Sequence, residues 1–150
     1  MTAYQVDAMT HVFVDKHRVE FFETDLAGIV HFANFYRFME QAEHSFFRSL
    51  DLQIHGTTPD GVVFGWPRVS ANCSFKSPAY YGDEIEVRLT ISRLTRRSLT
   101  ITYEFQRDGV LLALGEMKSA YCIFPPGSKL ESAEMPDNFY DRLCPNRAGS

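Results

Sequence analysis

One stretch of the sequence joins a strand to a helix: ETDLAGIVHFANF, residues 23–35. Before it, the charged residues Lys16, Arg18 and Glu20 alternate with His17, Val19 and Phe21, which is typical of a half-buried strand. After it, apolar residues recur at helical spacing: Phe35, Phe38, Met39, Ala42, Phe46 and Leu50. We expect Asn34 to cap this helix, because asparagine is a favoured N-cap residue.

The predicted helix is rich in phenylalanine, which suggests burial over much of its surface. Its polar residues fall mostly on the side opposite the apolar stripe: Arg37, Gln41, Glu43, His44 and Arg48. A helix of this kind packs its apolar side against another layer, and the rest of the sequence supplies strands for that layer.

The remaining chain is predicted to form strands. Residues 62–77 form one extended segment with a bend at Pro67, and residues 110–124 form another, which ends at the Pro-Pro-Gly of residues 125–127. Between them, apolar and polar residues alternate over 84–91 and again over 99–105. Asp108-Gly109 predicts a two-residue hairpin turn, and a short helix is expected over residues 137–143. Consecutive strands after one long helix favour an α+β class with an antiparallel sheet.

The long strands also point to an oligomer. Residues 110–124 are apolar on both faces near their start, and a sheet of long strands leaves an edge that must be paired or covered. Pairing across a two-fold axis is one way to cover such an edge. We therefore expect a homodimer or homotetramer.

Length and composition exclude several classes of protein. A chain of 150 residues fits a single domain, with a core at about residues 12–124 and a tail at 125–150. The formal net charge of −4 argues against a general nucleic-acid binder. Three widely spaced cysteines, Cys73, Cys122 and Cys144, fit reduced thiols in a cytoplasmic protein better than a disulfide framework. Residues 1–14 lack a signal-peptide pattern, and no apolar run is long enough for a membrane span.

Several common catalytic motifs are absent from the sequence. It contains no glycine-rich phosphate loop, no Gly-x-Ser-x-Gly and no His-Glu-x-x-His. Glu40 and His44 are four residues apart on the predicted helix and could share a metal ion, but an ordinary side-chain pair is the simpler explanation of the spacing. We expect no metal site and no separate cofactor.

Asp25 is the residue best placed for chemistry. It sits in a turn just before the helix, whose N-terminus carries free N–H groups and a positive partial charge. A carbonyl group placed there would be polarised, and Asp25 could attack it or activate water. Gly28 would let the backbone approach a ligand closely. The alternative is that Asp25 only caps a turn and Gly28 only supplies a positive φ angle.

The residues of this stretch resemble the signature of the hot-dog acyl-CoA thioesterases, in particular the aspartate-type 4-hydroxybenzoyl-CoA thioesterase family. The most specific block is Asp-x-x-Gly-Ile-Val-x-x-x-Asn at residues 25–34. The similarity continues through weaker segments in the same order, at residues 65–75, 81–84, 94–98 and 135–137. The resemblance therefore covers about residues 14–143.

The resemblance implies a hot-dog fold, an antiparallel sheet wrapped around one long helix, and thioester hydrolysis without a metal or redox cofactor. It places Asp25 as the catalytic aspartate, acting as nucleophile or general base. The backbone N–H of Phe32 would point at the thioester oxygen. Gly28, His31 and Glu40 are the expected substrate-binding positions; for His31 the alternative is a packed or surface histidine, and for Glu40 a charge on the helix surface.

A second cluster of interest is the basic turn Arg96-Arg97-Ser98, which matches a turn that binds the phosphates of CoA in related enzymes. Guanidinium groups suit this role because they donate paired hydrogen bonds to phosphate oxygens. The alternative is an ordinary solvated hairpin.

Together these observations predict an acyl-CoA thioesterase that acts on an aromatic, hydroxybenzoyl-like or medium apolar acyl group, with an active site shared across a dimer interface. The competing hypothesis is a non-catalytic hot-dog module that binds acyl-CoA or serves as an assembly subunit. A hot-dog dehydratase would need a catalytic histidine, which the Asp25 motif does not supply. No membrane or nucleic-acid partner is expected.

Overall fold

The computed structural model describes residues 4–5 and 11–144 of the chain. The stretch for which no signal peptide is expected, residues 1–14, lies mostly outside this range, as do residues 145–150 of the expected tail.

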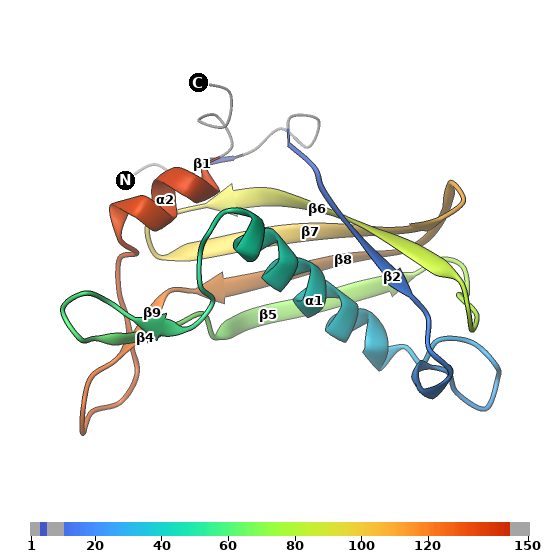
Figure 1. Ribbon diagram of the computed structural model, residues 1–150, viewed down its shortest axis with the longest axis horizontal. Helices are drawn as coiled ribbons and strands as arrows, with labels where there is room; N and C mark the ends of the chain where they lie inside the picture. Colours follow the sequence, from blue (N-terminus) through green and yellow to red (C-terminus); the bar gives the residue numbers. More distant parts are fainter. Residues whose placement is uncertain (1–3, 6–10, 145–150) are drawn as a thin grey trace.

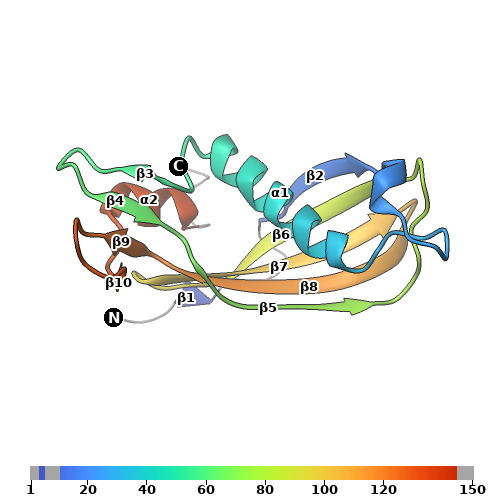
Figure 2. The same cartoon turned by 90° about the horizontal axis from the view of Figure 1, so that it is seen from below.

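One long helix, α1 (Ala33–Ser49), lies across one face of an antiparallel sheet (Figures 1 and 2). In the sheet the order is β1-β6-β7-β8-β5, and β2 pairs with β6 beside the part that β1 contacts. The strands are β1 (Tyr4–Gln5), β2 (Phe13–Arg18), β5 (Arg68–Phe75), β6 (Glu84–Leu94), β7 (Ser98–Arg107) and β8 (Val110–Ala120). The predicted α+β class is confirmed.

A smaller antiparallel sheet with the order β10-β9-β4-β3 lies at one end of the molecule. Its strands are β3 (Gly56–Thr57), β4 (Val63–Gly65), β9 (Cys122–Phe124) and β10 (Glu131–Ser132). The second helix, α2 (Asp137–Leu143), packs against it through Phe139, whose ring lies 5.3 Å from that of Phe64. The helix predicted for residues 137–143 is thus confirmed.

Two predicted strands are each divided between the two sheets. The segment 62–77 breaks at Trp66-Pro67 into β4 and β5, and the segment 110–124 breaks at Tyr121 into β8 and β9. The breaks face each other, since the Ala120 N–H donates to the Pro67 carbonyl at 3.0 Å. Proline cannot donate a ladder hydrogen bond, so a strand is readily interrupted there.

The predicted start of the helix and the end of the first strand also need correction. The helix begins at Ala33 with Phe32 as its N-cap, and Asn34 lies inside it. The Asn34 side chain is buried and donates to the Glu23 carbonyl at 2.8 Å, so it ties the helix to the preceding segment instead of capping it. The strand ends at Arg18; Phe21 opens the 3-10 turn η1 (Phe21–Glu23) and is exposed, not on a buried face.

The core lies between α1 and the large sheet. The helix buries Phe35, Phe38 and Met39 against β-strand residues, and the Phe35 ring lies 5.2 Å from that of Phe105. Gly115 on β8 allows the close approach of the helix, because a Cβ atom there would overlap the Met39 Sδ atom. The predicted hairpin turn is confirmed, since Asp108 and Gly109 both have positive φ angles, 49° and 79°.

Candidate active site

Asp25 lies in a tight loop between η1 and α1. The loop is held by main-chain bonds: the Asp25 N–H donates to the Ile29 carbonyl at 2.9 Å, and the Gly28 N–H donates back to the Asp25 carbonyl at 2.9 Å. Gly28 has a φ angle of 80°, which a residue with a side chain rarely adopts. The loop therefore presents Asp25 in a fixed position close to the N-terminus of α1.

Asp25 lines a cavity of about 490 Å³. Its Oδ1 atom accepts a hydrogen bond from the Ala27 N–H at 2.8 Å. Within the described residues, Oδ2 has no hydrogen-bond partner and is open to a ligand or water. The cavity is otherwise mainly apolar, with Phe32, Phe35 and Phe75 among its walls.

The start of α1 adds a free N–H group beside the same cavity. Phe32 is the N-cap, and within the described part of the chain its N–H makes no main-chain hydrogen bond. The Phe32 side chain is 59% exposed and meets the edge of Phe75, with ring centroids 6.3 Å apart. An N–H at the positive end of a helix can stabilise an oxygen that gains negative charge, as a carbonyl oxygen does when its carbon is attacked.

None of the predicted substrate-binding residues, Gly28, His31 and Glu40, is among the residues that line this cavity. His31 is exposed, and its ring contacts that of Phe32 at a tilted angle, with ring centroids 4.8 Å apart. Glu40 lies two turns further along α1, where its carboxylate is 3.9 Å from the Arg68 guanidinium. The structure therefore brings Asp25 and Phe32 together at the cavity, while Gly28 lies in the turn that holds Asp25, and His31 and Glu40 lie outside the cavity wall.

A buried polar cluster under α1 was missed by sequence reasoning. Glu43 is buried and binds Arg68 of β5 at 2.6 Å, and Arg68 also donates to the Ser119 hydroxyl at 2.9 Å. Burial raises the pKa of the nearby Tyr103 phenol far above its ordinary value, and the charge of Glu43 adds to this effect. Expecting Glu43 on the polar side of the helix was wrong. Its spacing from Met39, four residues earlier on the buried stripe, was the available signal.

The basic turn lies far from Asp25 in the same chain. Residues 95–97 connect β6 and β7 at one end of the sheet, whereas the Asp25 loop lies at the opposite end (Figures 1 and 2).

The residues of the basic turn bind other parts of the chain. Arg96 binds Asp137 of α2 at 2.8 Å and lies over the Tyr140 ring at 4.0 Å. Arg97 donates to the Ser132 carbonyl at 3.2 Å. Ser98 pairs with the Thr95 hydroxyl at 2.9 Å, so all three predicted CoA-binding residues have partners within the chain.

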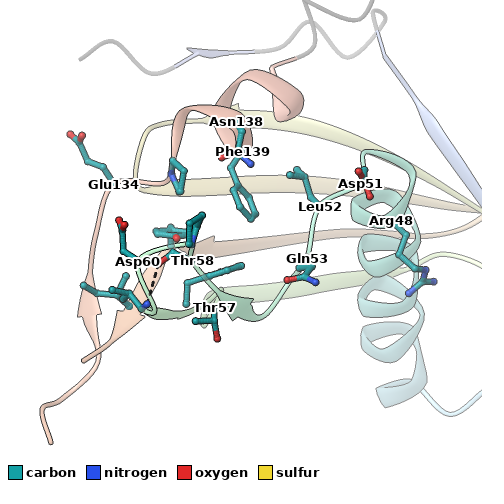
Figure 3. Close-up of a pocket in the computed structure, with 16 residues that line it drawn as sticks. Arg48, Asp51, Leu52, Gln53, Thr57, Thr58, Asp60, Glu134, Asn138 and Phe139 are labelled. Carbon is teal, nitrogen blue, oxygen red and sulfur yellow. Dashed lines mark hydrogen bonds between the residues drawn. The ribbon is translucent and has the colours of Figure 1, made fainter. Parts of the chain in front are cut away.

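A different hollow, of about 880 Å³, lies between the C-terminal end of α1, the small sheet and α2 (Figure 3). Phe64, Tyr121 and Phe139 contribute an aromatic floor. Asp51, Asp60 and Glu134 are among its lining residues, so the negatively charged phosphates of CoA would meet carboxylates there.

No group of three or more histidine, cysteine, aspartate or glutamate residues close enough to hold a metal ion is found in residues 4–5 and 11–144. The three cysteines are free thiols, and burial raises the pKa of Cys73 to about 11, so this thiol is protonated at neutral pH. None of the described helices has the length and apolar character that crossing a membrane requires.

Comparison with known proteins identifies the class of protein that this fold and site define. Residues 27–113 match the family model described as the thioesterase superfamily, and the chain belongs to that family. The predicted hot-dog fold and the predicted resemblance to acyl-CoA thioesterases are confirmed.

Individual relatives in this family act on CoA thioesters of aromatic acids. A 1,4-dihydroxy-2-naphthoyl-CoA hydrolase of Nostoc punctiforme is 30% identical over 137 residues, which cover 90% of this chain and 88% of that protein. The 4-hydroxybenzoyl-CoA thioesterase of a Pseudomonas species is 28% identical over 134 residues, which cover 86% of this chain and 94% of that protein. The solved structure of a gentisyl-coenzyme A thioesterase superposes with a TM-score of 0.72 at 29% identity, over 85% of this chain and 98% of that one.

Proposed function

We propose that the protein hydrolyses the thioester of an aromatic, hydroxybenzoyl-like acyl-CoA, or of one with a medium apolar acyl group, to the free acid and CoA. One observation carries the proposal: Asp25, whose Oδ2 atom has no hydrogen-bond partner among the described residues, lines a mainly apolar cavity together with Phe32 at the N-terminus of α1. The relatives named above act on aromatic acyl-CoA thioesters, and aromatic walls at Phe35 and Phe75 suit such an acyl group.

In the proposed reaction, the thioester carbonyl oxygen lies at the start of α1, where the Phe32 N–H stabilises its developing charge. Asp25 either attacks the carbonyl carbon, forming an anhydride that water then hydrolyses, or removes a proton from the attacking water. Both routes break the carbon–sulfur bond, consume one water molecule and return one proton to the sulfur of CoA. Neither route calls for a metal or a redox cofactor.

We also propose that a second copy of the chain completes the site. Among the described residues, strand β5 pairs only with β8, and all residues of β5 except Cys73 are exposed. Antiparallel pairing of β5 with the same strand of a second copy would bury this edge. It would also place the Arg68 end of one β5 beside the Phe75 end of the other.

This arrangement accounts for the separation of the two predicted sites within one chain. In such a dimer, the end of the sheet that carries Arg96 and Arg97 lies on the same side as the partner subunit's Asp25. The acyl group would then occupy the cavity of one protomer while the CoA phosphates reach the basic turn of the other. The Asp25 cavity and the basic turn become parts of one elongated site.

The test is release of free thiol from a series of acyl-CoAs by the purified protein, with Asp25→Asn as the inactive control. We expect 4-hydroxybenzoyl-CoA and benzoyl-CoA to be hydrolysed faster than acetyl-CoA, and Asp25→Asn to be inactive on all three. Tight binding of these acyl-CoAs without turnover by the wild-type protein would contradict the proposal and support the non-catalytic module.

A further inference from the structure

Glu23 is a buried carboxylate that the proposed reaction does not use. Its side chain is only 7% exposed, and it does not line the Asp25 cavity. The Nε2 atom of His17 lies 2.8 and 3.0 Å from the two carboxylate oxygens, and the Glu20 N–H donates to Oε1 at 2.7 Å. An ionised carboxylate can only accept, so in that state His17 is the donor.

The main-chain carbonyl of Glu23 also accepts two hydrogen bonds. It accepts from the His31 N–H at 2.9 Å and from the Asn34 side-chain amide at 2.8 Å. The first bond closes the loop that contains Asp25 at its base. The second fixes the first turn of α1, so that the loop and the helix start are joined at the same residue.

The partner on the other side of Glu23 belongs to a third element. His17 lies on β2, and its ring packs on Phe38 of α1 with centroids 4.4 Å apart. Glu23 is therefore linked to strand β2 through its carboxylate and to α1 through its carbonyl. A buried polar contact of this kind is weak evidence for stability alone, because removing both groups from water opposes the interaction gained between them. Such a network also holds the elements that it joins, β2, the Asp25 loop and α1, in fixed positions relative to one another.

We propose that the His17–Glu23–Asn34 network is a positioning device, which sets the Asp25 carboxylate relative to the N-terminus of α1. The proposal rests on the role of Asp25 in the proposed function. In the reaction described above, the carboxylate and the Phe32 N–H must meet the two ends of one carbonyl group. Displacing a catalytic group by about 1 Å can cost on the order of 100-fold in rate, even when the substituted residue is far from the reacting atoms.

The test compares Glu23→Met, Glu23→Gln and Asn34→Ala with the matched control Glu86→Met, which removes a partly exposed glutamate on β6. We expect Glu23→Met to lower kcat at least about ten-fold while KM stays within about three-fold. Glu23→Gln should keep most of the wild-type kcat, because the glutamine amide oxygen can still accept hydrogen bonds from His17 and from the Glu20 N–H. Asn34→Ala lowers kcat without touching the buried carboxylate, and Glu86→Met changes neither constant.

Thermal unfolding and circular dichroism of each variant separate lost positioning from lost folding. If Glu23→Met does not fold, Asn34→Ala decides the question with the carboxylate in place. Full kcat in the folded variants, or losses that only follow the fraction unfolded, would overturn the positioning role while Asp25→Asn stays inactive. Activity in Asp25→Asn would instead overturn the proposed function, and the positioning role with it.

Discussion

At the Asp25 end of the sheet, apolar side chains face solvent and a carboxylate oxygen is open. Phe21, Phe22 and Leu26 are exposed there, close to the loop that carries Asp25. At the opposite end, both arginines of the basic turn are engaged by the C-terminal segment. Exposed apolar groups and an open carboxylate indicate a surface that a ligand or second chain covers, whereas paired charges indicate groups that already serve the fold.

Charged side chains have different roles at the two ends of the sheet. Among the described residues, the Asp25 side chain makes one hydrogen bond, which it accepts from the Ala27 N–H, so a conservative replacement leaves the core unchanged. Arg96 links the β6–β7 turn to α2 through Asp137 and Tyr140, so its replacement alters the packing of that end. Substitutions at the two ends should therefore differ in kind as well as in size.

The largest effect is expected at Asp25. Asp25→Asn keeps the oxygen that accepts from Ala27 and removes the charge, so the fold should persist while kcat falls at least ~100-fold, the scale of a lost catalytic base or nucleophile. Steady-state thiol release and a melting curve check both parts. Turnover near the wild-type rate would show that Asp25 only caps a turn and is not catalytic.

The next effect concerns the exposed edge strand. Val69 lies on β5 and is 58% exposed. We expect the wild-type protein to have at least twice the 17.2 kDa mass of one chain in light scattering, and Val69→Asp to shift the population toward the monomer. Activity should fall with the dimer, because each site would need both copies. Val110→Asp, at an exposed position on the interior strand β8, is the matched control. A fully active monomer would show that one Asp25 end is complete by itself.

Smaller effects are expected at the basic turn, and they should differ between Arg97 and Arg96. Arg97 is the more exposed arginine and is held by weaker contacts, so Arg97→Ala should raise KM for acyl-CoA several-fold, leave kcat unchanged and flatten the salt dependence of KM. A short acyl-N-acetylcysteamine thioester, which lacks the phosphates, should show no change.

Arg96 is the contrasting variant at the same turn. Arg96→Ala should lower the melting temperature, consistent with about 1 kcal/mol for an exposed ion pair and a cation–π contact together, and should affect both substrates alike. If Arg96→Ala instead changed KM only for acyl-CoA, Asp137 would have to give way to phosphate on binding.

The sequence predicted more at the Asp25 end than elsewhere, and the reasons are physical. The block at residues 25–34 is local: a turn, a glycine with positive φ and a helix start are encoded by neighbouring residues. Asn34 was misplaced because its partner, the Glu23 carbonyl, is set by the loop closure and not by the helix itself. Glu43 was misplaced because Arg68, which compensates its burial, lies 25 residues away on an edge strand.

The same distinction explains the strands. Alternation located β6 and β7 because one face of each is buried along its length. It could not show that residues 62–77 and 110–124 each leave one sheet for another. That break depends on the pairing of Pro67 with Ala120, which are far apart in the chain.

The smallest effect is expected at His31, a predicted binding residue that lies between the cavity-lining residues Val30 and Phe32. His31 is exposed and its ring contacts Phe32 at a tilted angle. Its main-chain N–H, which any residue except proline would supply, closes the Asp25 loop on the Glu23 carbonyl. His31→Ala removes only the ring, so kcat and KM should both stay within about three-fold of wild type, the size of a lost exposed contact. The pH profile of kcat should keep its shape, which distinguishes a packing role from proton transfer. A lost limb in that profile at a pH near the ordinary histidine pKa would instead add a second titrating group to the Asp25 end.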